Sequence, residues 1–381
     1  MKQFFLYPFL FFLFTGCTTG DYTSIVTATL SRNPTAAFES YARSKTIQYA
    51  VNPKRLKSDL KFLSHFMENI SKQWGNDIKV PRKKEYVKYM QNYKSRALID
   101  FDKGVITVET LADKKSLKNA IVTTLLLPDD PRGADLFNAK KVKLGSTPYL
   151  LGEVKDDQNK NIRYVWRANR YANILLKKNY KVKKIKISGK IKKVYFVEFP
   201  MIKDHATIRV RKFRPYVKQY AKLYGVSENL VYAIIKTESN FNQFAISKAG
   251  AYGLMQIVPK SAGRDAYKYV KGKSISPSKN YLFNAKNNIE LGVAYLNLLD
   301  TKYLYGIKNP ISKEYCIISA YNTGSGNVLK TFAKDKNRAK AVINSKKPSQ
   351  IYNILQSKLP YIETRKYLKK VILSKRDFIN L

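Results

Sequence analysis

The sequence predicts two domains, an α+β domain over residues 46–202 followed by a mainly α-helical domain over residues 203–381. A chain of 381 residues is long for one domain. Glycine-centred hairpin patterns alternate with helical patterns up to about residue 200, and after His205 the helical pattern continues alone. The 44% of hydrophobic residues is enough to build packed cores despite the high charge.

Residues 1–16 have the features of a signal peptide. Lys2 precedes an apolar run from Phe4 to Phe14, which is too short to cross a membrane. The ending L-F-T-G-C resembles the lipobox of bacterial lipoproteins, which implies cleavage before Cys17 and acylation of its thiol. In that class Thr18 after the cysteine implies export to the outer membrane, facing the periplasm, with residues 17–45 as tether. An ordinary cleaved signal peptide with an incidental cysteine is the alternative.

The first domain mixes hairpins with helices, the pattern of an α+β domain. Asp102-Lys103-Gly104 separates two strand-like runs and places glycine where a three-residue hairpin loop needs positive φ. Ser188-Gly189 separates a second pair of runs. In chain order we expect a hairpin, a helix that ends at Pro128, a strand, a helix and a hairpin at residues 97–110, 117–128, 162–166, 171–176 and 182–199. Because this region has no catalytic constellation, we expect it to be a scaffold or to bind a polymer or a partner.

The second domain is predicted from apolar residues at helical spacing. Gly225 is typical of a left-handed helix end, and Ser227 with Glu228 is typical of the start of the next helix. We expect helices at residues 213–224, 228–238, 285–299, 314–321, 351–355 and 363–373.

Glu238 is the candidate functional acid. It follows Leu230 and Ile234 at four-residue spacing, so it continues an apolar stripe and should face the interior or the wall of a cleft. Such a carboxyl group either pairs with a buried arginine or caps a neighbouring element, or it has a raised pKa and serves as a general acid. The next carboxylate in the chain is Asp265, so Glu238 is isolated in sequence.

The surroundings of Glu238 favour a sugar-binding groove. Uncharged donors and acceptors follow it at Ser239, Asn240, Asn242, Ser247 and Gln256. Further along, Tyr321-Asn322 stands at the end of a predicted helix, where the tyrosine is either part of the core or part of a site wall.

Four blocks resemble the soluble lytic transglycosylases of glycoside hydrolase family 23, which have a goose-type lysozyme fold. They are T-E-S-N-F-N, G-L-M-Q, A-Y-N-T-G and E-T-R-K-Y-L, at residues 237–242, 253–256, 320–324 and 363–368. In the first domain, Y-V-K-Y at 86–89 and L-L-L-P-D-D-P at 125–131 resemble the membrane-bound lytic murein transglycosylase C family. The resemblance implies a lysozyme-like catalytic domain behind an accessory domain.

The resemblance also implies a reaction and its residues. Glu238 corresponds to a single catalytic acid, and the substrate would be contacted by Ser247, Met255, Gln256, Tyr321, Asn322 and Glu363. The implied activity is cleavage of the MurNAc-β-1,4-GlcNAc bond of peptidoglycan without water, leaving 1,6-anhydro-MurNAc ends, in cell-wall remodelling and turnover. The partners would be glycan strands and, through the lipid on Cys17, a membrane. No metal or cofactor is expected, and the two histidines, His65 and His205, lack ligand spacing.

Two alternatives stay open, and nucleic-acid binding is a third possibility that only the charge suggests. A lysozyme-type hydrolase would use Glu238 with water, and a distant acid such as Glu363 could fold beside it. A non-catalytic peptidoglycan-binding lipoprotein is a second alternative. The net charge of +44, from 71 Lys and Arg against 27 Asp and Glu, attracts polyanions or forms a lysine-rich solvated surface. No nucleic-acid motif accompanies it, so nucleic acid is not expected as a partner.

Overall fold

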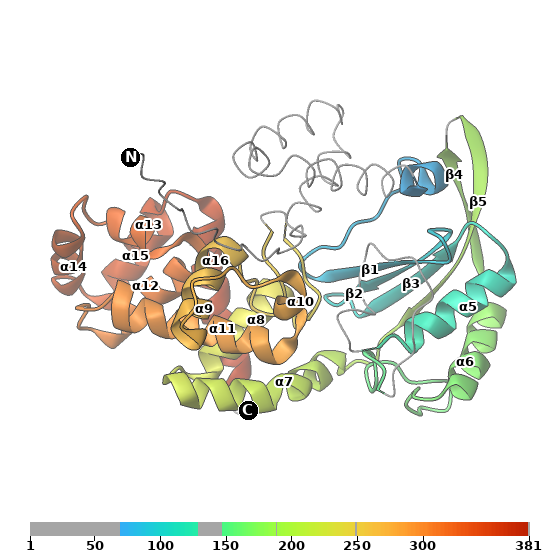
Figure 1. The fold of residues 1–381 in the computed structure, drawn as a ribbon, viewed down its shortest axis with the longest axis horizontal. Helices are drawn as coiled ribbons and strands as arrows, with labels where there is room; N and C mark the ends of the chain where they lie inside the picture. Colours follow the sequence, from blue (N-terminus) through green and yellow to red (C-terminus); the bar gives the residue numbers. More distant parts are fainter. Residues whose placement is uncertain (1–68, 129–146, 188, 248–249, 380–381) are drawn as a thin grey trace, which may run out of the picture.

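The computed structural model describes residues 69–128, 147–187, 189–247 and 250–379. The predictions for Cys17, the signal peptide, the tether and residues 129–131 lie outside these ranges. A sheet with two helices forms one end of the molecule and a group of helices forms the other (Figure 1). The predicted fold class, an α+β domain before a mainly helical one, is confirmed, whereas the division at residues 202 and 203 stays a prediction.

The accessory domain is built on a five-stranded antiparallel sheet of order β1-β2-β3-β5-β4. Its strands are β1 (Glu85–Met90), β2 (Ser95–Asp100), β3 (Val105–Thr110), β4 (Lys181–Ile187) and β5 (Lys190–Pro200). Both predicted hairpins are confirmed, with Gly104 at φ 65 and Gly189 at φ 82 in their turns. The first loop is one residue longer than predicted, because β2 ends at Asp100 and Phe101 turns its side chain into the core.

Two helices, α5 (Lys114–Leu125) and α6 (Val165–Lys178), pack on the sheet and on each other (Figure 1). The strand predicted at residues 162–166 is wrong, because Val165 already begins α6. Tyr164 and Trp166 are exposed and pair with no strand, whereas Ala168, Ala172 and Leu175 form the buried stripe of the helix. β-Branched and aromatic residues form a strand only where a neighbouring strand can pair with them.

The second domain is helical, with no strand among its described residues. The bounds are α7 (His205–Tyr224), α8 (Glu228–Ser239), α9 (Arg264–Lys271), α10 (Lys279–Phe283), α11 (Ala285–Leu298), α12 (Pro310–Thr323), α13 (Ser325–Lys330), α14 (Lys336–Asn344), α15 (Pro348–Lys358) and α16 (Ile362–Lys375). Helix α8 packs against α7 and α16, so its residues are buried on several sides. All six predicted helices are present, and α9, α10, α13 and α14 were not predicted.

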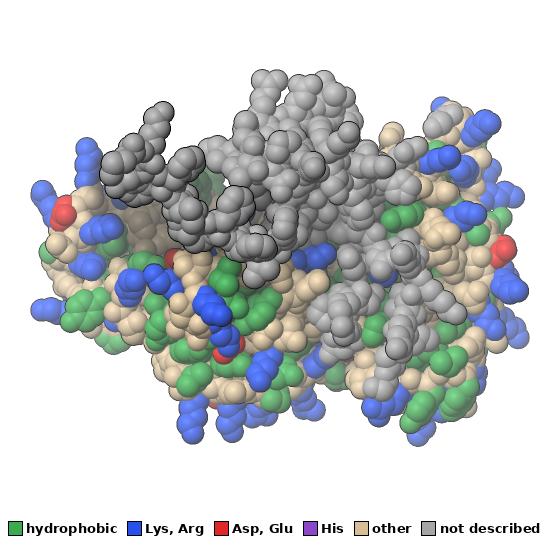
Figure 2. Space-filling model, in the orientation of Figure 1, with side chains coloured by type: hydrophobic (Ala, Val, Ile, Leu, Met, Phe, Trp, Pro, Cys, Tyr) green, Lys and Arg blue, Asp and Glu red, His purple; other side chains and the backbone are tan. Residues whose placement is uncertain are grey.

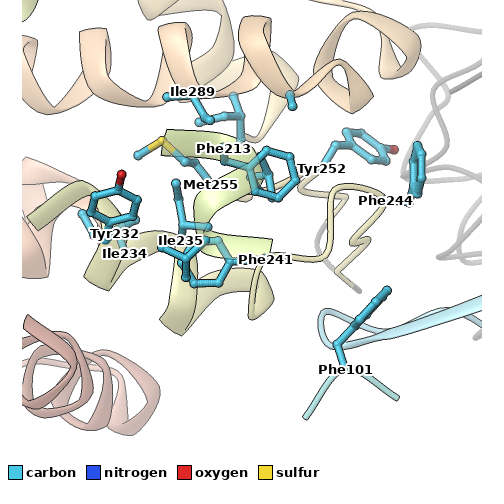
Figure 3. Close-up of a cluster of buried hydrophobic side chains, with 14 of the residues drawn as sticks. Phe101, Phe213, Tyr232, Ile234, Ile235, Phe241, Phe244, Tyr252, Met255 and Ile289 are labelled. Carbon is cyan, nitrogen blue, oxygen red and sulfur yellow. The ribbon is translucent and has the colours of Figure 1, made fainter. Parts of the chain in front are cut away.

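The helical core gathers around α8. Ile234 and Ile235 of α8 lie near Phe213 of α7 and Phe241 after α8, and the last two stack their rings at 6.5 Å (Figure 3). Burial of such side chains contributes about 1.5–3 kcal/mol each. The core therefore holds the C-terminal end of α8, where Glu238 lies, in a fixed position.

A buried interface joins the two domains. Tyr149 of the accessory domain packs on Phe244 with ring centroids 5.0 Å apart. Arg209 of α7 places its Nε 3.0 Å from Oε2 of Glu153, and both side chains are about 1% exposed. The side-chain amide of Asn240 donates to the carbonyl of Phe101 at 2.9 Å. These contacts fix the start of β1 beside the end of α8.

Candidate active site

A cleft with a volume of ≈ 1430 Å³ lies where the two domains meet. One wall is residues 80–85 of the accessory domain, the segment that leads into β1. The end of α8 and the loop after it supply the floor, and α12 and α16 supply the opposite side. The cleft is therefore shared between domains, and its size suits an extended ligand.

Glu238 lies in the last turn of α8 and is 4% exposed, which confirms the prediction that it faces inward. The helix ends at Ser239, and both Asn240 and Phe241 after it have positive φ, so the chain turns sharply after the acid. Burial raises the pKa of Glu238, nearby Lys83 and Tyr367 lower it, Glu363 raises it, and the net direction is upward. A carboxyl group in this setting can hold a proton closer to neutral pH than an exposed glutamate can.

Lys83 is the nearest charged neighbour of Glu238. Its Nζ lies 3.2 Å from Glu238 Oε2 and 3.9 Å from Glu363 Oε1. The lysine belongs to the accessory domain, so a residue 155 positions earlier in the chain reaches the acid.

Glu363 brings a second carboxylate into the cleft. It lies in the first turn of α16 with a side chain 78% exposed. Glu363 and Glu238 both contact the Nζ of Lys83, so the two carboxyl groups lie within reach of one cation. The two acids differ in environment, since one is buried and the other is solvated.

Two tyrosines flank Glu238. Tyr321 of α12 donates its hydroxyl to the carbonyl of Met255 at 2.8 Å. The hydroxyl of Tyr367 of α16 lies close enough to the Glu238 carboxylate to lower its pKa. It does not meet the distance and angle limits of a hydrogen bond. Burial, then the charge of Glu238, raises the pKa of both phenols well above the usual value, so both stay neutral.

Ser247 and Gln256 lie on the floor of the cleft. The hydroxyl of Ser247 accepts a hydrogen bond from the amide of Ala251 at 3.0 Å. The side-chain amide of Gln256 donates to the carbonyls of Gly253 at 3.0 Å and Ala245 at 3.2 Å. Its Oε1 is buried and has no hydrogen-bond partner.

Of the other two predicted substrate contacts, Asn322 lines the cleft and Met255 does not. The Oδ1 of Asn322 accepts a hydrogen bond from the Thr364 hydroxyl at 2.7 Å, which ties α12 to α16. Met255 is a correction: its side chain is fully buried, packs against Gly292 and does not line the cleft. The next residue, Gln256, has a positive φ of 50. The carbonyl of Met255 accepts the hydrogen bond from the Tyr321 hydroxyl.

Sequence reasoning missed Lys83, Tyr367 and Thr364. The last two could have been found, because both lie in the block at 363–368, where Tyr367 also follows Glu363 by one helical turn. Lys83 had no local pattern to distinguish it among 71 basic residues. Within the described ranges, no group of three His, Cys, Asp or Glu side chains could hold a metal ion. Nor does any helix there have the length and apolar character to cross a membrane.

Comparison with known proteins finds two matching families. The model described as "Membrane-bound lytic murein transglycosylase C, N-terminal domain" matches residues 49–212, and "Transglycosylase SLT domain" matches residues 215–344. A relative named membrane-bound lytic murein transglycosylase C from Actinobacillus succinogenes is 44% identical over 314 residues, 82% of this chain and 87% of the relative. One from Klebsiella pneumoniae subsp. pneumoniae is 41% identical over 321 residues, 83% and 88% of the two chains.

Solved structures give a weaker likeness. An inactive mutant of the lytic transglycosylase Slt from Pseudomonas aeruginosa shares 25% sequence identity with a TM-score of 0.32. The match covers 42% of this chain and 23% of that one.

Proposed function

This chain belongs to the membrane-bound lytic murein transglycosylase C family, and on that basis we propose that it is a peptidoglycan lytic transglycosylase. The reaction is cleavage of the β-1,4 bond between MurNAc and GlcNAc, with formation of a 1,6-anhydro-MurNAc end. The observation that carries the proposal is a buried carboxyl group, Glu238, with a raised pKa on the floor of a large interdomain cleft. The other residues act by position and polarity around it.

In the first step Glu238 is the general acid. Its proton passes to the oxygen that links MurNAc to GlcNAc, the bond from that oxygen to C1 of MurNAc breaks, and the GlcNAc side leaves as an alcohol. The muramyl 2-acetamido oxygen stabilises the positive charge that develops at C1. Gln256 supports this step by position and polarity, since it lines the same cleft as Glu238.

In the second step the same group is the general base. Glu238, now ionised, removes the proton from the muramyl C6 hydroxyl, whose oxygen attacks C1 and closes the 1,6-anhydro ring. Glu238 regains its proton, and no water is consumed. Tyr321 and Ser247 help to orient the sugar, because both line the cleft and Tyr321 is held by the carbonyl of Met255.

A second candidate is hydrolysis by two carboxylates, as in a lysozyme. The observation that favours it is Glu363, an exposed carboxylate that reaches the same lysine as Glu238. In that mechanism Glu363 would activate a water molecule or attack C1 directly. The product would then be a reducing end in place of an anhydro end.

The site of action is proposed to be the cell envelope. Lipid on Cys17 would hold the enzyme at the outer membrane, facing the periplasm, and two or more acyl chains give stable anchoring. The relatives' names describe membrane-bound enzymes. Lysine and arginine side chains are spread over the visible face of both domains (Figure 2), which would attract the carboxylates of peptidoglycan peptides.

Mass spectrometry of muropeptides released from purified sacculi tests the proposal. We expect anhydro ends from the wild-type protein and no release by Glu238→Gln, although this variant still binds sacculi. Reducing ends, one water heavier, would favour the lysozyme-type reaction. Equal release by wild type and Glu238→Gln would mean that Glu238 is not the acid, and absence of release by wild type would favour a non-catalytic binding protein.

A further inference from the structure

We propose that Lys83 is a positioning residue for the reaction, through which the accessory domain holds the Glu238 carboxylate in place between the acid step and the base step. The inference rests on the proposed function and extends it, because it gives a part of the catalytic cycle to a domain outside the lysozyme-like one. It is carried by the geometry of residues 82–85 and by the charges that face Glu238.

The backbone of Lys83 is held rigidly at the tip of a tight turn. Arg82 and Glu85 close the turn with two backbone hydrogen bonds, at 3.0 and 3.3 Å. The carbonyl of Lys83 accepts from the side-chain amide of Asn242 at 3.3 Å, which is a contact across the domain interface. The turn is therefore fixed both to its own strand and to the loop that follows Glu238.

The two lysines of this turn have different partners. Lys84 points back to its own domain, where its Nζ lies 2.8 Å from Asp102 Oδ1. Lys83 crosses to the other domain and contacts Glu238 at 3.2 Å. Its side chain is 37% exposed, so the ammonium group keeps water on one side while it faces a carboxylate that is 5% exposed.

The groups that face Glu238 come from three elements. Lys83 approaches from the turn before β1, Glu363 and Tyr367 from α16, and Tyr321 from α12. Among these described neighbours Lys83 alone carries a positive charge. It opposes both the desolvation of the carboxylate and the repulsion from Glu363.

This arrangement matters most between the two chemical steps. After Glu238 has given up its proton, a buried carboxylate must persist until the C6 hydroxyl is in place. The ammonium group of Lys83, 3.2 Å away, stabilises that carboxylate. Without Lys83, Glu238 would be a weaker acid, because its charged form would lose its nearest counter-charge, and the first step would slow down.

The pH dependence of kcat/KM distinguishes this role from a structural one. We compare full-length wild type with Lys83→Met, Lys83→Arg and the control Lys103→Ala, which removes an exposed lysine of the same domain. The alkaline limb of the profile reports loss of the proton from Glu238. For Lys83→Met we expect this limb to move to higher pH by about one unit and kcat to fall about tenfold to a hundredfold. Lys83→Arg and Lys103→Ala should keep the wild-type limb.

A profile of Lys83→Met that coincides with wild type, even at a lower rate, would overturn the inference, because a merely structural loss does not move the limb. An equal shift of the alkaline limb in Lys103→Ala and Lys83→Met would also overturn the inference. The shift would then come from the loss of any positive charge in the domain. Reducing ends in wild-type digests would refute the transglycosylase reaction separately. If the reaction were hydrolysis, the pH profile would still measure the effect of Lys83, because Glu238 would be the acid in that reaction too.

Discussion

At the scale of single residues, the account depends on the environment of Glu238. Its position on the apolar face of α8 follows from four-residue spacing after Leu230 and Ile234, so its burial could be predicted from sequence. Its charged neighbours could not be predicted, because Lys83 comes from another domain and Glu363 from a helix 125 positions later in the chain. Local periodicity carries no information on such contacts.

The raised pKa of Glu238 predicts a stability gain on its replacement. Below about pH 4.5, the pKa of the acid in the unfolded chain, Glu238 is protonated in both the folded and the unfolded state. Its ionisation then makes no contribution to the free energy of unfolding. As pH rises toward the higher folded-state pKa, ionisation favours the unfolded chain and stability is lost. Glu238→Gln removes this cost, and Lys83, which is partly exposed, keeps its hydration. We therefore expect the thermal midpoint of Glu238→Gln to exceed that of wild type at pH 7 and to approach it near pH 4. A lower midpoint at pH 7 would contradict this.

At the scale of elements, α16 contributes more to the cleft than the sequence blocks suggested. Glu363, Lys366, Tyr367 and Lys370 fall on one face at three- and four-residue spacing, and all line the cleft. The hairpins were predictable because Gly104 and Gly189 supply the positive φ that their turns need. The start of α6 was not, because its exposed first turn carries Val165 and Trp166, residue types that are enriched in strands.

The cleft face of α16 predicts a preference for peptide-bearing glycan. Lys366 and Lys370 are exposed there and form no ion pair with a described acid, so they can meet the carboxylates of peptide stems. For Lys366→Ala/Lys370→Ala we expect kcat/KM on stem-bearing strands to fall about threefold to tenfold, with a smaller change on strands whose stems have been removed. Lys369→Ala, which changes an exposed lysine of the same helix that does not line the cleft, is the matched control. Equal losses on both substrates would rule out recognition of the stems.

At the scale of the whole molecule, the interface between the domains positions the turn that carries Lys83. Arg209 is central to it, since it pairs with Glu153 and also donates to the carbonyl of Phe101 at 3.2 Å. Sequence reasoning placed a helix near here but gave no sign that its first turns bind the accessory domain. An interface of this kind depends on chain segments that only the folded structure brings together.

Removal of Arg209 should therefore destabilise the molecule. Arg209→Met leaves the Glu153 carboxylate buried without its nearest cation, and breaking a buried pair in this way costs about 3–5 kcal/mol of unfolding free energy. Chemical denaturation measures the loss, and Arg211→Met, at an exposed position on the same helix, should stay within about 0.5 kcal/mol of wild type. If Arg209→Met were equally close to wild type, the interface would not depend on this pair.

The central claim is that one carboxyl group, Glu238, serves as both acid and base. The most direct measurement is the rate of anhydromuropeptide release by Glu238→Gln and Glu363→Gln on the same sacculi. We expect Glu238→Gln to lose about a hundredfold to ten-thousandfold in rate, as removal of a general acid and base does, while Glu363→Gln keeps anhydro products at a rate within about tenfold of wild type. Comparable losses in both variants, with reducing ends among the wild-type products, would instead show a reaction shared by two carboxylates.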